Sequence, residues 1–471
     1  MNRRTFLQDA SLLAASPFFG LSASAAAPGL PVVRPAAGQR RFRSRAVEAA
    51  IAEFQQQVKD PELGWLFGNC FPNTLDTTVT PGTRAGRPDT YVITGDIDAM
   101  WLRDSSAQVW PYLQFIAKDA PLRQLVAGVI NRQTRCILQD PYANAFYNDP
   151  TKVGEWKTDQ TAMQPGVHER KWEIDSLCYP IRLSYHYWKT TGDEQPFDAQ
   201  WRQAIELVVK TFREQQRKAG PGPYHFQRLT TTSTDTQPLA GYGYPVRPVG
   251  LIASAFRPSD DATLLPFLVP SNFFAVASLR QAALMLNDIH HDAAAYKQLM
   301  DFADEVAAAL SQHATVAHPV HGRVYAYEVD GYGSYTLLDD ANVPSLLALP
   351  YLGAVPLNDP TYQNTRRLLL SADNPFFYKG SAAEGIGGPH VGVDMIWPIA
   401  ITMRGLTSTD EAEIRACVQA LKTTHAGTGY MHESFHKDNA SKYTRAWFAW
   451  ANTLFGEFLW KVYKERPALL G

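Results

Sequence analysis

Cysteine is scarce in this sequence, and neither sign of charge dominates it. Four cysteines occur among 471 residues, at 70, 136, 178 and 417, too far apart for the paired spacing of a zinc ribbon. A disulfide and buried free thiols both remain open, because sequence alone does not choose between them. The 44 lysines and arginines nearly balance the 46 aspartates and glutamates. This balance gives no basic surface for nucleic acid and no acidic tail for cations.

Long apolar runs are missing after the N-terminus, so we expect the mature chain to be soluble. The N-terminus reads MNRRTFLQDASLLAASPFFGLSASAAAP, in which Arg3 and Arg4 precede a weakly apolar run and then small residues. This pattern is typical of a bacterial export signal of the twin-arginine type, here over residues 1–27. We therefore expect a periplasmic or secreted protein, with residues 28–45 as a connector.

Helical periodicity dominates the rest of the chain, and polar loops rich in glycine, proline and aromatic residues separate the helices. This alternation is typical of helical hairpins that close into a ring, although a helical solenoid would give a similar alternation of helices and loops. We expect one domain over 46–471. Its expected helices are 46–59, 105–116, 121–138, 176–189, 197–216, 272–286, 293–310, 343–352, 360–370, 391–403, 409–421 and 440–463, with short strands at 91–93 and 323–328.

One stretch places charges beside large apolar residues just ahead of a helix. It reads TGDIDAMWLRDSSAQVWPYL, over 94–113, and carries three aspartates and an arginine. Burying such charges costs free energy unless they pair with opposite charges or bind a ligand. A capping-box pattern predicts that the helix begins at Ser106. The segment WEID, at 172–175, has the same relation to the next helix, which favours two loops that share one cleft.

Acidic side chains recur in loops that also carry aromatic residues. Cleavage of a glycosidic bond uses such a set, because one carboxylic acid protonates the leaving oxygen and a second carboxylate attacks or activates water. Further carboxylates, arginines and histidines bind sugar hydroxyls, and an aromatic ring covers the apolar face of a sugar. The acidic loops are 96–104, 173–175, 257–261, 339–342 and 432–436, and 388–390 is a neutral sixth.

The last of these loops also satisfies a zinc-protease pattern, since His432–His436 reads HESFH. That motif needs an uninterrupted helix, with both histidines on one face, and a third ligand. Glycines at 427 and 429 precede the motif and a turn-like KDN follows it. A zinc protease is therefore the weaker interpretation. Neither a serine-nucleophile elbow nor a phosphate-binding glycine loop occurs in the sequence.

Five long segments together resemble glycoside hydrolase family 125, the exo-α-1,6-mannosidases of bacteria and fungi. They are GDIDAMWLRDSSAQVWPYL, WEIDSLCYPIRLSYHYW, FRPSDDATLLPFLVPSNFFAV, YGSYTLLDDANVPSLLALPYLG and YMHESFHKDNASKYTRAWFAWANTLFGEFL. The resemblance runs in order from about residue 45 to the C-terminus. It implies an all-α fold, an (α/α)6 toroid with long functional loops at one end and a few short strands. It also implies hydrolysis with inversion, without a metal or other cofactor.

The resemblance further implies roles for single residues. The aspartate pair after Arg257 resembles the loop that holds the general acid, which we place on Asp260 with Asp261 as the alternative, and Glu433 resembles the general base. Inversion needs water between base and sugar, so the two carboxyls are expected roughly 6.5–9.5 Å apart. The implied sugar-binding residues are Trp101, Arg103, Asp104, Glu173, Asp175, Arg257, Asp261, Asp340 and His390.

The expected partner is then a mannose-containing oligosaccharide or glycan. Two other functions fit the same residues. One is an inverting (α/α)6 glycosidase with a different sugar specificity. The other is a non-catalytic periplasmic sugar-binding protein, which would keep the tryptophan, arginine and aspartate contacts but needs no acid and base pair.

Overall fold

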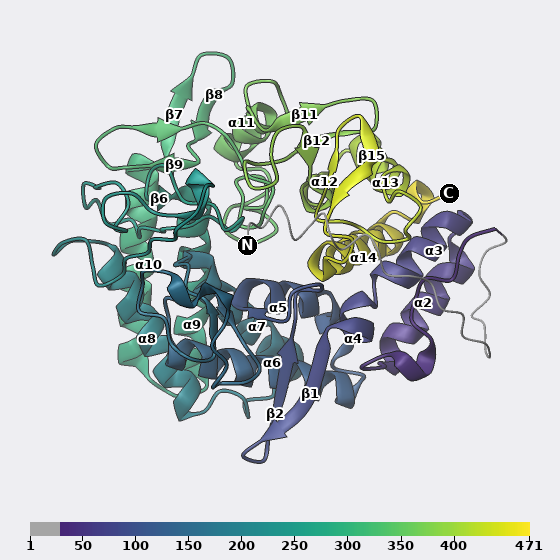
Figure 1. Ribbon diagram of the computed structural model, residues 1–471, viewed down its shortest axis with the longest axis horizontal. Coiled ribbons are helices and arrows are strands. Elements are labelled where there is room, and N and C mark those ends of the chain that lie inside the picture. The colour runs from purple at the N-terminus through teal and green to yellow at the C-terminus, as the bar shows by residue number, and fades with distance from the viewer. Residues whose placement is uncertain (1–28) are drawn as a thin grey trace.

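The computed structural model describes residues 29–471, in which the helices form a ring (Figure 1). Around the inside of the ring, α5 packs against α7, α7 against α9, α12 against α14, and α14 against α5. Helices α3, α6, α10 and α13 pack against members of this inner set. The helices are α2 (Arg45–Gln57), α3 (Pro61–Cys70), α4 (Asn73–Thr77), α5 (Leu102–Val109), α6 (Ala120–Gln139), α7 (Ile174–Thr191), α8 (Ala199–Gln215), α9 (Val269–Asp288), α10 (Ala293–His313), α11 (Pro360–Leu369), α12 (Pro398–Leu406), α13 (Glu411–Thr423) and α14 (Ala449–Glu465).

The two sets of helices begin differently. An aspartate side chain accepts backbone N–H groups at the start of α3, α6, α8, α10, α11 and α13. Such caps satisfy donors that the first helical turn leaves unpaired. The inner helices α5, α7, α9, α12 and α14 have no side-chain cap. Their uncapped, partly positive N-termini follow the loops that the sequence suggested as functional.

Small antiparallel sheets hold these loops against the ends of the inner helices. The strand β3 leads directly into α5, β6 into α9 and β13 into α12. The six sheets contain β1 (Val79–Arg84) with β2 (Arg87–Val92); β3 (Met100–Trp101), β4 (Ala145–Phe146) and β5 (Val167–Glu169); β6 (Phe267–Leu268), β9 (Glu328–Val329) and β10 (Tyr335–Thr336); β7 (Thr315–His318) with β8 (Gly322–Tyr325); β11 (Phe377–Lys379) with β12 (Glu384–Ile386); and β13 (Met395–Ile396), β14 (Ser434–His436) and β15 (Asn439–Thr444).

Several expected element boundaries were wrong. Helix α5 begins at Leu102, not at Ser106, and a 3-10 turn over Trp110–Phe115 follows it, because Pro111 cannot continue the α-helical hydrogen bonds. Residues 343–352 form turns instead of a helix, and two prolines interrupt them. The expected helices 391–403 and 440–463 begin later, at 398 and 449, because strands occupy the residues before them.

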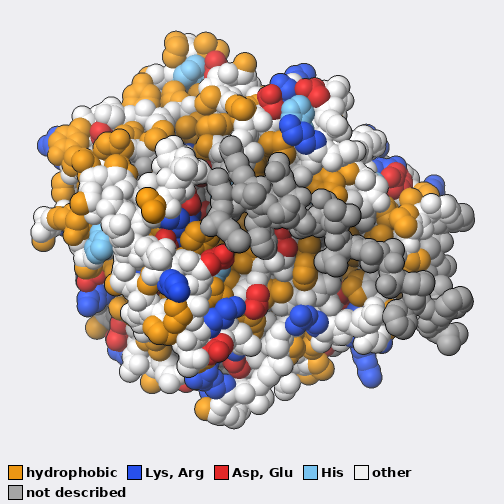
Figure 2. All heavy atoms as spheres, in the orientation of Figure 1, with side chains coloured by type: hydrophobic (Ala, Val, Ile, Leu, Met, Phe, Trp, Pro, Cys, Tyr) orange, Lys and Arg blue, Asp and Glu red, His pale blue; other side chains and the backbone are white. Residues whose placement is uncertain are grey.

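The surface charge is mixed, as the composition suggested. Figure 2 shows acidic and basic side chains interspersed over the face in view. All four cysteines are buried free thiols, which decides between the two alternatives left open by the sequence.

Across residues 29–471, none of the helices combines the length and the apolar character needed to cross a membrane. The expected export signal, 1–27, lies outside the described residues.

Candidate active site

A cavity of about 950 Å³ opens at the start of the inner helices. Its lining includes Trp101, Trp397 and Phe448, which are the residues immediately before α5, α12 and α14. Loops around 229–235, 258–261 and 389–391 complete the wall. The sequence suggested that the loops 94–104 and 172–175 share one cleft. Residues of 94–104 line the cavity, whereas 172–175 lies behind the lining, where Glu173 and Asp175 contact Arg103.

Arg103 is the centre of the charge arrangement at the floor of the cavity. Its Nη1 donates to Glu173 Oε2 at 2.6 Å and to Asp175 Oδ2 at 2.9 Å. Asp104 and Asp260 lie 3.6 and 3.7 Å from other nitrogens of the same guanidinium. One buried cation therefore faces four carboxyl groups.

Burial, together with this excess of acid, shifts the protonation of the floor. Burial alone would lower the pKa of Arg103, but the negative charges of Glu173, Asp175 and the other carboxylates raise it. Burial raises the pKa of Glu173, and it raises the pKa of Asp104 to about 6. Glu173 Oε1 and Asp175 Oδ1 are buried without a hydrogen-bond partner.

The two adjacent aspartates have different surroundings. Asp260 lines the cavity, and its backbone is in the left-handed region at φ 69°. Its N–H donates to Arg257 O at 2.9 Å, and its carbonyl oxygen accepts from Lys171 Nζ at 2.8 Å. These bonds hold a conformation that a non-glycine residue rarely adopts.

Asp261 also lines the cavity but is buried, with His390 Nδ1 at 3.5 Å from its Oδ1. Burial alone would raise the pKa of Asp261, but the hydrogen bond and charge of His390 lower it. A carboxyl held as an anion is a poor proton donor. Asp261 is therefore a poor candidate for a proton donor.

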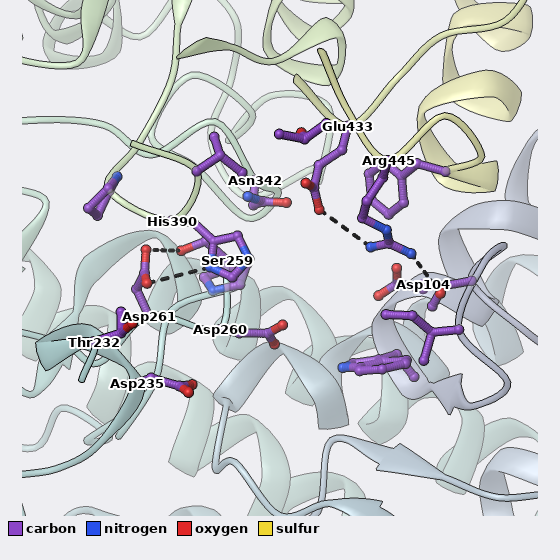
Figure 3. A pocket seen from close by; sticks show the side chains of 18 of the residues that line it. Asp104, Thr232, Asp235, Ser259, Asp260, Asp261, Asn342, His390, Glu433 and Arg445 are labelled. Carbon is purple, nitrogen blue, oxygen red and sulfur yellow. Dashed lines mark hydrogen bonds and ion pairs between the residues drawn. The ribbon is translucent and has the colours of Figure 1, made fainter. Parts of the chain in front are cut away.

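Glu433 lies across the cavity from Asp260 (Figure 3). Arg445 Nη1 is 3.4 Å from Glu433 Oε1, and the same guanidinium donates to Asp96 Oδ1 at 2.6 Å and to Thr94 Oγ1 at 3.0 Å. Asp96, in the loop ahead of α5, thus anchors the arginine beside Glu433.

The H-E-x-x-H pattern around Glu433 does not form the helix that a zinc protease requires. Ser434–His436 is the strand β14, and the ring of His432 stacks on Tyr443 with centroids 3.7 Å apart. Burial lowers the pKa of His432 to about 4, so this histidine is a neutral packing group. The zinc-protease interpretation lacks its structural basis.

Within residues 29–471, His318, His321 and Asp373 form the one group of side chains close enough to share a metal ion, with ligand atoms within 4.8 Å of one another. The group does not line the cavity. The Nδ1 atom of His318 accepts the backbone N–H groups of Val320 and His321, at 3.3 and 3.2 Å. Its lone pair is already used, which makes this histidine a poor ligand.

The structure distributes the sugar-binding candidates over two layers. Trp101, Arg103, Asp104, Asp261 and His390 line the cavity, while Glu173, Asp175, Asp340 and Arg257 lie behind the lining. Asp340 Oδ2 accepts from Ser259 Oγ at 2.6 Å. Arg257 Nε donates to Glu328 Oε1 at 2.7 Å, so this arginine supports the acid loop from behind.

Sequence reasoning missed several lining residues. Arg445, Asn342 and Trp156 line the cavity but were not selected. Arg445 lies in the segment KYTRAWFAW that carried the family resemblance, so an available signal could have found it. Trp156 lies in a loop without any recognisable motif.

The comparisons with known proteins agree with this geometry. Residues 60–460 match the family described as metal-independent alpha-mannosidase, GH125. The chain belongs to this family. It is therefore a glycoside hydrolase of the α-mannosidase type, as the sequence resemblance suggested.

Individual relatives cover most of the chain. The Meiotically up-regulated gene 157 protein of Schizosaccharomyces pombe is 42% identical over 461 residues, which span 94% of this chain and 90% of that protein. A metal-independent α-mannosidase from Streptococcus pneumoniae, solved in a non-productive complex with α-1,6-mannobiose, is 40% identical, with a TM-score of 0.86 over 90% of this chain and all of that one. A bacterial glucoamylase complexed with acarbose is 13% identical, with a TM-score of 0.54 over 86% of this chain and 57% of that chain, which is a likeness of fold alone. The expected (α/α)6 class is confirmed.

Proposed function

We propose that this mannosidase removes a terminal, non-reducing α-1,6-linked mannose with inversion, with Asp260 as general acid and Glu433 as general base. One observation carries the proposal. The two carboxyl groups, remote in sequence, enter one cavity from opposite walls, and Arg103 and Asp104 lie at its floor (Figure 3). Two carboxyl groups on opposite sides of one cavity are what glycoside hydrolysis requires.

The reaction proceeds in one displacement. Asp260 gives its proton to the glycosidic oxygen as the bond from that oxygen to the anomeric carbon breaks. Glu433 takes a proton from a water molecule whose oxygen attacks the same carbon from the opposite face. Arg445, with its Nη1 at 3.4 Å from Glu433 Oε1, helps to hold the base in position. The expected separation of roughly 6.5–9.5 Å would leave room for that water.

The floor of the cavity would bind the terminal sugar. Arg103 and Asp104 offer donors and acceptors to its hydroxyls, and the indole of Trp101 offers an apolar face. Glu173 and Asp175 hold the arginine in position through the ion pairs described above. The choice of α-1,6-linked mannose is supported by the complex of the pneumococcal relative with α-1,6-mannobiose.

The test is hydrolysis of mannobioses of defined linkage, followed by NMR to identify the anomer released first. We expect cleavage of the α-1,6 isomer with β-mannose as the first product. Release of α-mannose first would contradict inversion. Preference for another linkage or sugar would favour the related glycosidase of different specificity.

A Glu433→Gln variant separates an enzyme from a sugar-binding protein. We expect this variant to bind α-1,6-mannobiose with nearly unchanged affinity but to lose turnover by roughly 10²–10⁴-fold, the usual contribution of a general base. Glu411→Gln, on the exposed start of α13, is the matched control and should keep full turnover. A wild-type protein that binds mannosides without hydrolysing any of them would instead be a binding protein.

For localisation, we propose export to the periplasm or outside the cell by the twin-arginine route. Arg3 and Arg4, with the small residues that follow the apolar run, support this proposal. Replacing both arginines by lysine should keep the protein in the cytoplasm of a bacterial host, whereas unchanged export would contradict the proposed route.

A further inference from the structure

The cavity is larger than a single sugar needs. Pockets of ~300–1,000 Å³ hold drug-sized ligands, and this cavity, at about 950 Å³, is near the upper end of that range. A lone mannose is smaller than such ligands. The additional space is bordered by two loops, 155–158 and 229–235, from which Trp156, Leu229 and Thr230–Thr232 line the cavity.

These two loops form one rigid wall. Gln160 and Gln227 join them through a pair of backbone hydrogen bonds of 2.7 and 3.2 Å. The guanidinium of Arg228 lies 3.7 Å from the centre of the indole ring of Trp156. Arg228 is itself fixed by Asp159 at 2.6 Å and by Glu169 at 3.0 Å. The half-buried indole is therefore held by a buried cation while it borders the cavity.

The wall adjoins the proposed acid and not the proposed base. Lys171 Nζ contacts Asp235 Oδ1 at 2.6 Å and the carbonyl oxygen of Asp260 at 2.8 Å. Asp235 also accepts from Arg228 at 3.1 Å. Figure 3 shows Thr232 and Asp235 on the side of Asp260 and Asp261, with Glu433 and Arg445 on the opposite side. In an inverting hydrolase the leaving group lies on the side of the acid.

We propose that Trp156 and the 229–232 loop bind the sugars on the leaving-group side of the scissile bond, so that the enzyme prefers oligosaccharides over minimal mannosides. This inference rests on the proposed function and names the part of the substrate that the wall recognises. Trp156 offers a flat apolar surface for a pyranose ring. Leu229 is fully exposed beside three threonines, a mixture of apolar and hydroxyl groups that suits the two faces of a sugar.

The experiment compares kcat/KM for three substrates in wild type and in Trp156→Ala. α-Mannosyl fluoride has no sugar in its leaving group, whereas α-1,6-mannobiose and α-1,6-mannotriose have one and two. We expect Trp156→Ala to lower kcat/KM for mannotriose by about tenfold relative to wild type, and to leave the fluoride unchanged. Trp156→Phe should keep most of the preference for mannotriose, because it keeps an aromatic ring.

Trp188→Ala is the matched control. Trp188 is also half-buried under a cation, with Lys189 Nζ 3.8 Å from its ring, but it does not line the cavity. This control should keep all three rates. An equal loss on all substrates in Trp156→Ala, or no loss on any, would overturn the inference while leaving the proposed function intact. A wild-type enzyme that hydrolyses neither the fluoride nor the mannosides would overturn both.

Discussion

Lys171 reaches the backbone of the proposed acid from inside the protein. Its side chain is fully buried, and its Nζ donates to the carbonyl oxygen of Asp260 at 2.8 Å. Burial alone would lower the pKa of Lys171, but the negative charges of Glu169 and Asp235 raise it. A buried cation thus fixes a residue whose φ of 69° is uncommon for residues other than glycine.

Lys171 should therefore act as a positioning residue for the acid. We expect Lys171→Met to lower kcat on α-1,6-mannobiose by roughly 10–100-fold, because a small displacement of a catalytic group costs about 10²-fold. The rate on 2,4-dinitrophenyl α-mannoside should fall much less, since that leaving group departs without a proton. Steady-state kinetics on both substrates measure the difference.

The exposed Lys210 provides the control for this substitution, because its side chain pairs only loosely with Glu214 at 3.8 Å. Lys210→Met should keep both rates. Equal losses on the two substrates in Lys171→Met would contradict positioning of the acid and point to a general structural role. Circular dichroism of both variants checks that the fold is intact.

The same assay should distinguish the roles of the two adjacent aspartates. Asp260→Asn is expected to lose roughly 10²–10⁴-fold on mannobiose and far less on the dinitrophenyl mannoside, as the loss of a general acid predicts. Asp261→Asn breaks the pair with His390, so its smaller loss should be similar on both substrates. If Asp261→Asn alone showed the selective loss, the two roles would have to be exchanged.

Asp104 should make the stability of the protein depend on pH. Burial raises its pKa from 3.8 to about 6, with Asp260 adding to the effect against the opposing charge of Arg103. The folded protein therefore binds this proton more tightly than the unfolded chain does. The resulting stabilisation is complete below pH 3.8 and is lost as the pH rises through 6, by about 3 kcal/mol.

Urea unfolding of wild type and Asp104→Asn between pH 4 and 7 measures this effect, because the variant has no proton to lose at this position. The free energy of unfolding of wild type should fall relative to the variant as the pH rises. Asp98→Asn, in the same loop with a side chain 77% exposed, should give a profile parallel to wild type. Parallel profiles for Asp104→Asn as well would contradict the raised pKa.

The sequence identified most of the long helices and the acidic loops, because both follow from local patterns, but it missed α3 and predicted a helix at 343–352 that does not form. Amphipathic periodicity placed α6, α8 and α10 within a few residues. It misplaced the start of α14, since 439–444 pairs with β14 to form a strand. Strand pairing depends on a neighbour from elsewhere in the chain, which periodicity within a single window does not report.

The same distinction holds at the site. Arg103 and Asp104 stood out because charge beside apolar residues is a local signal. The support that Lys171 gives to Asp260 joins residues 89 positions apart. Trp156 was not recognised because its place in the cavity lining and its contact with Arg228 both depend on the fold. Such contacts are set by tertiary structure, and a single sequence does not contain their distances.

The cysteines give a final prediction, on redox state. All four thiols are buried and free, and burial raises the pKa of each of them above its usual value. A thiol reagent should therefore leave the native protein unlabelled, because neither access nor thiolate is available. After unfolding without a reductant, four thiols per chain should react, and a reductant should not change the Tm. A disulfide formed on export would instead give two reactive thiols and a Tm that falls on reduction.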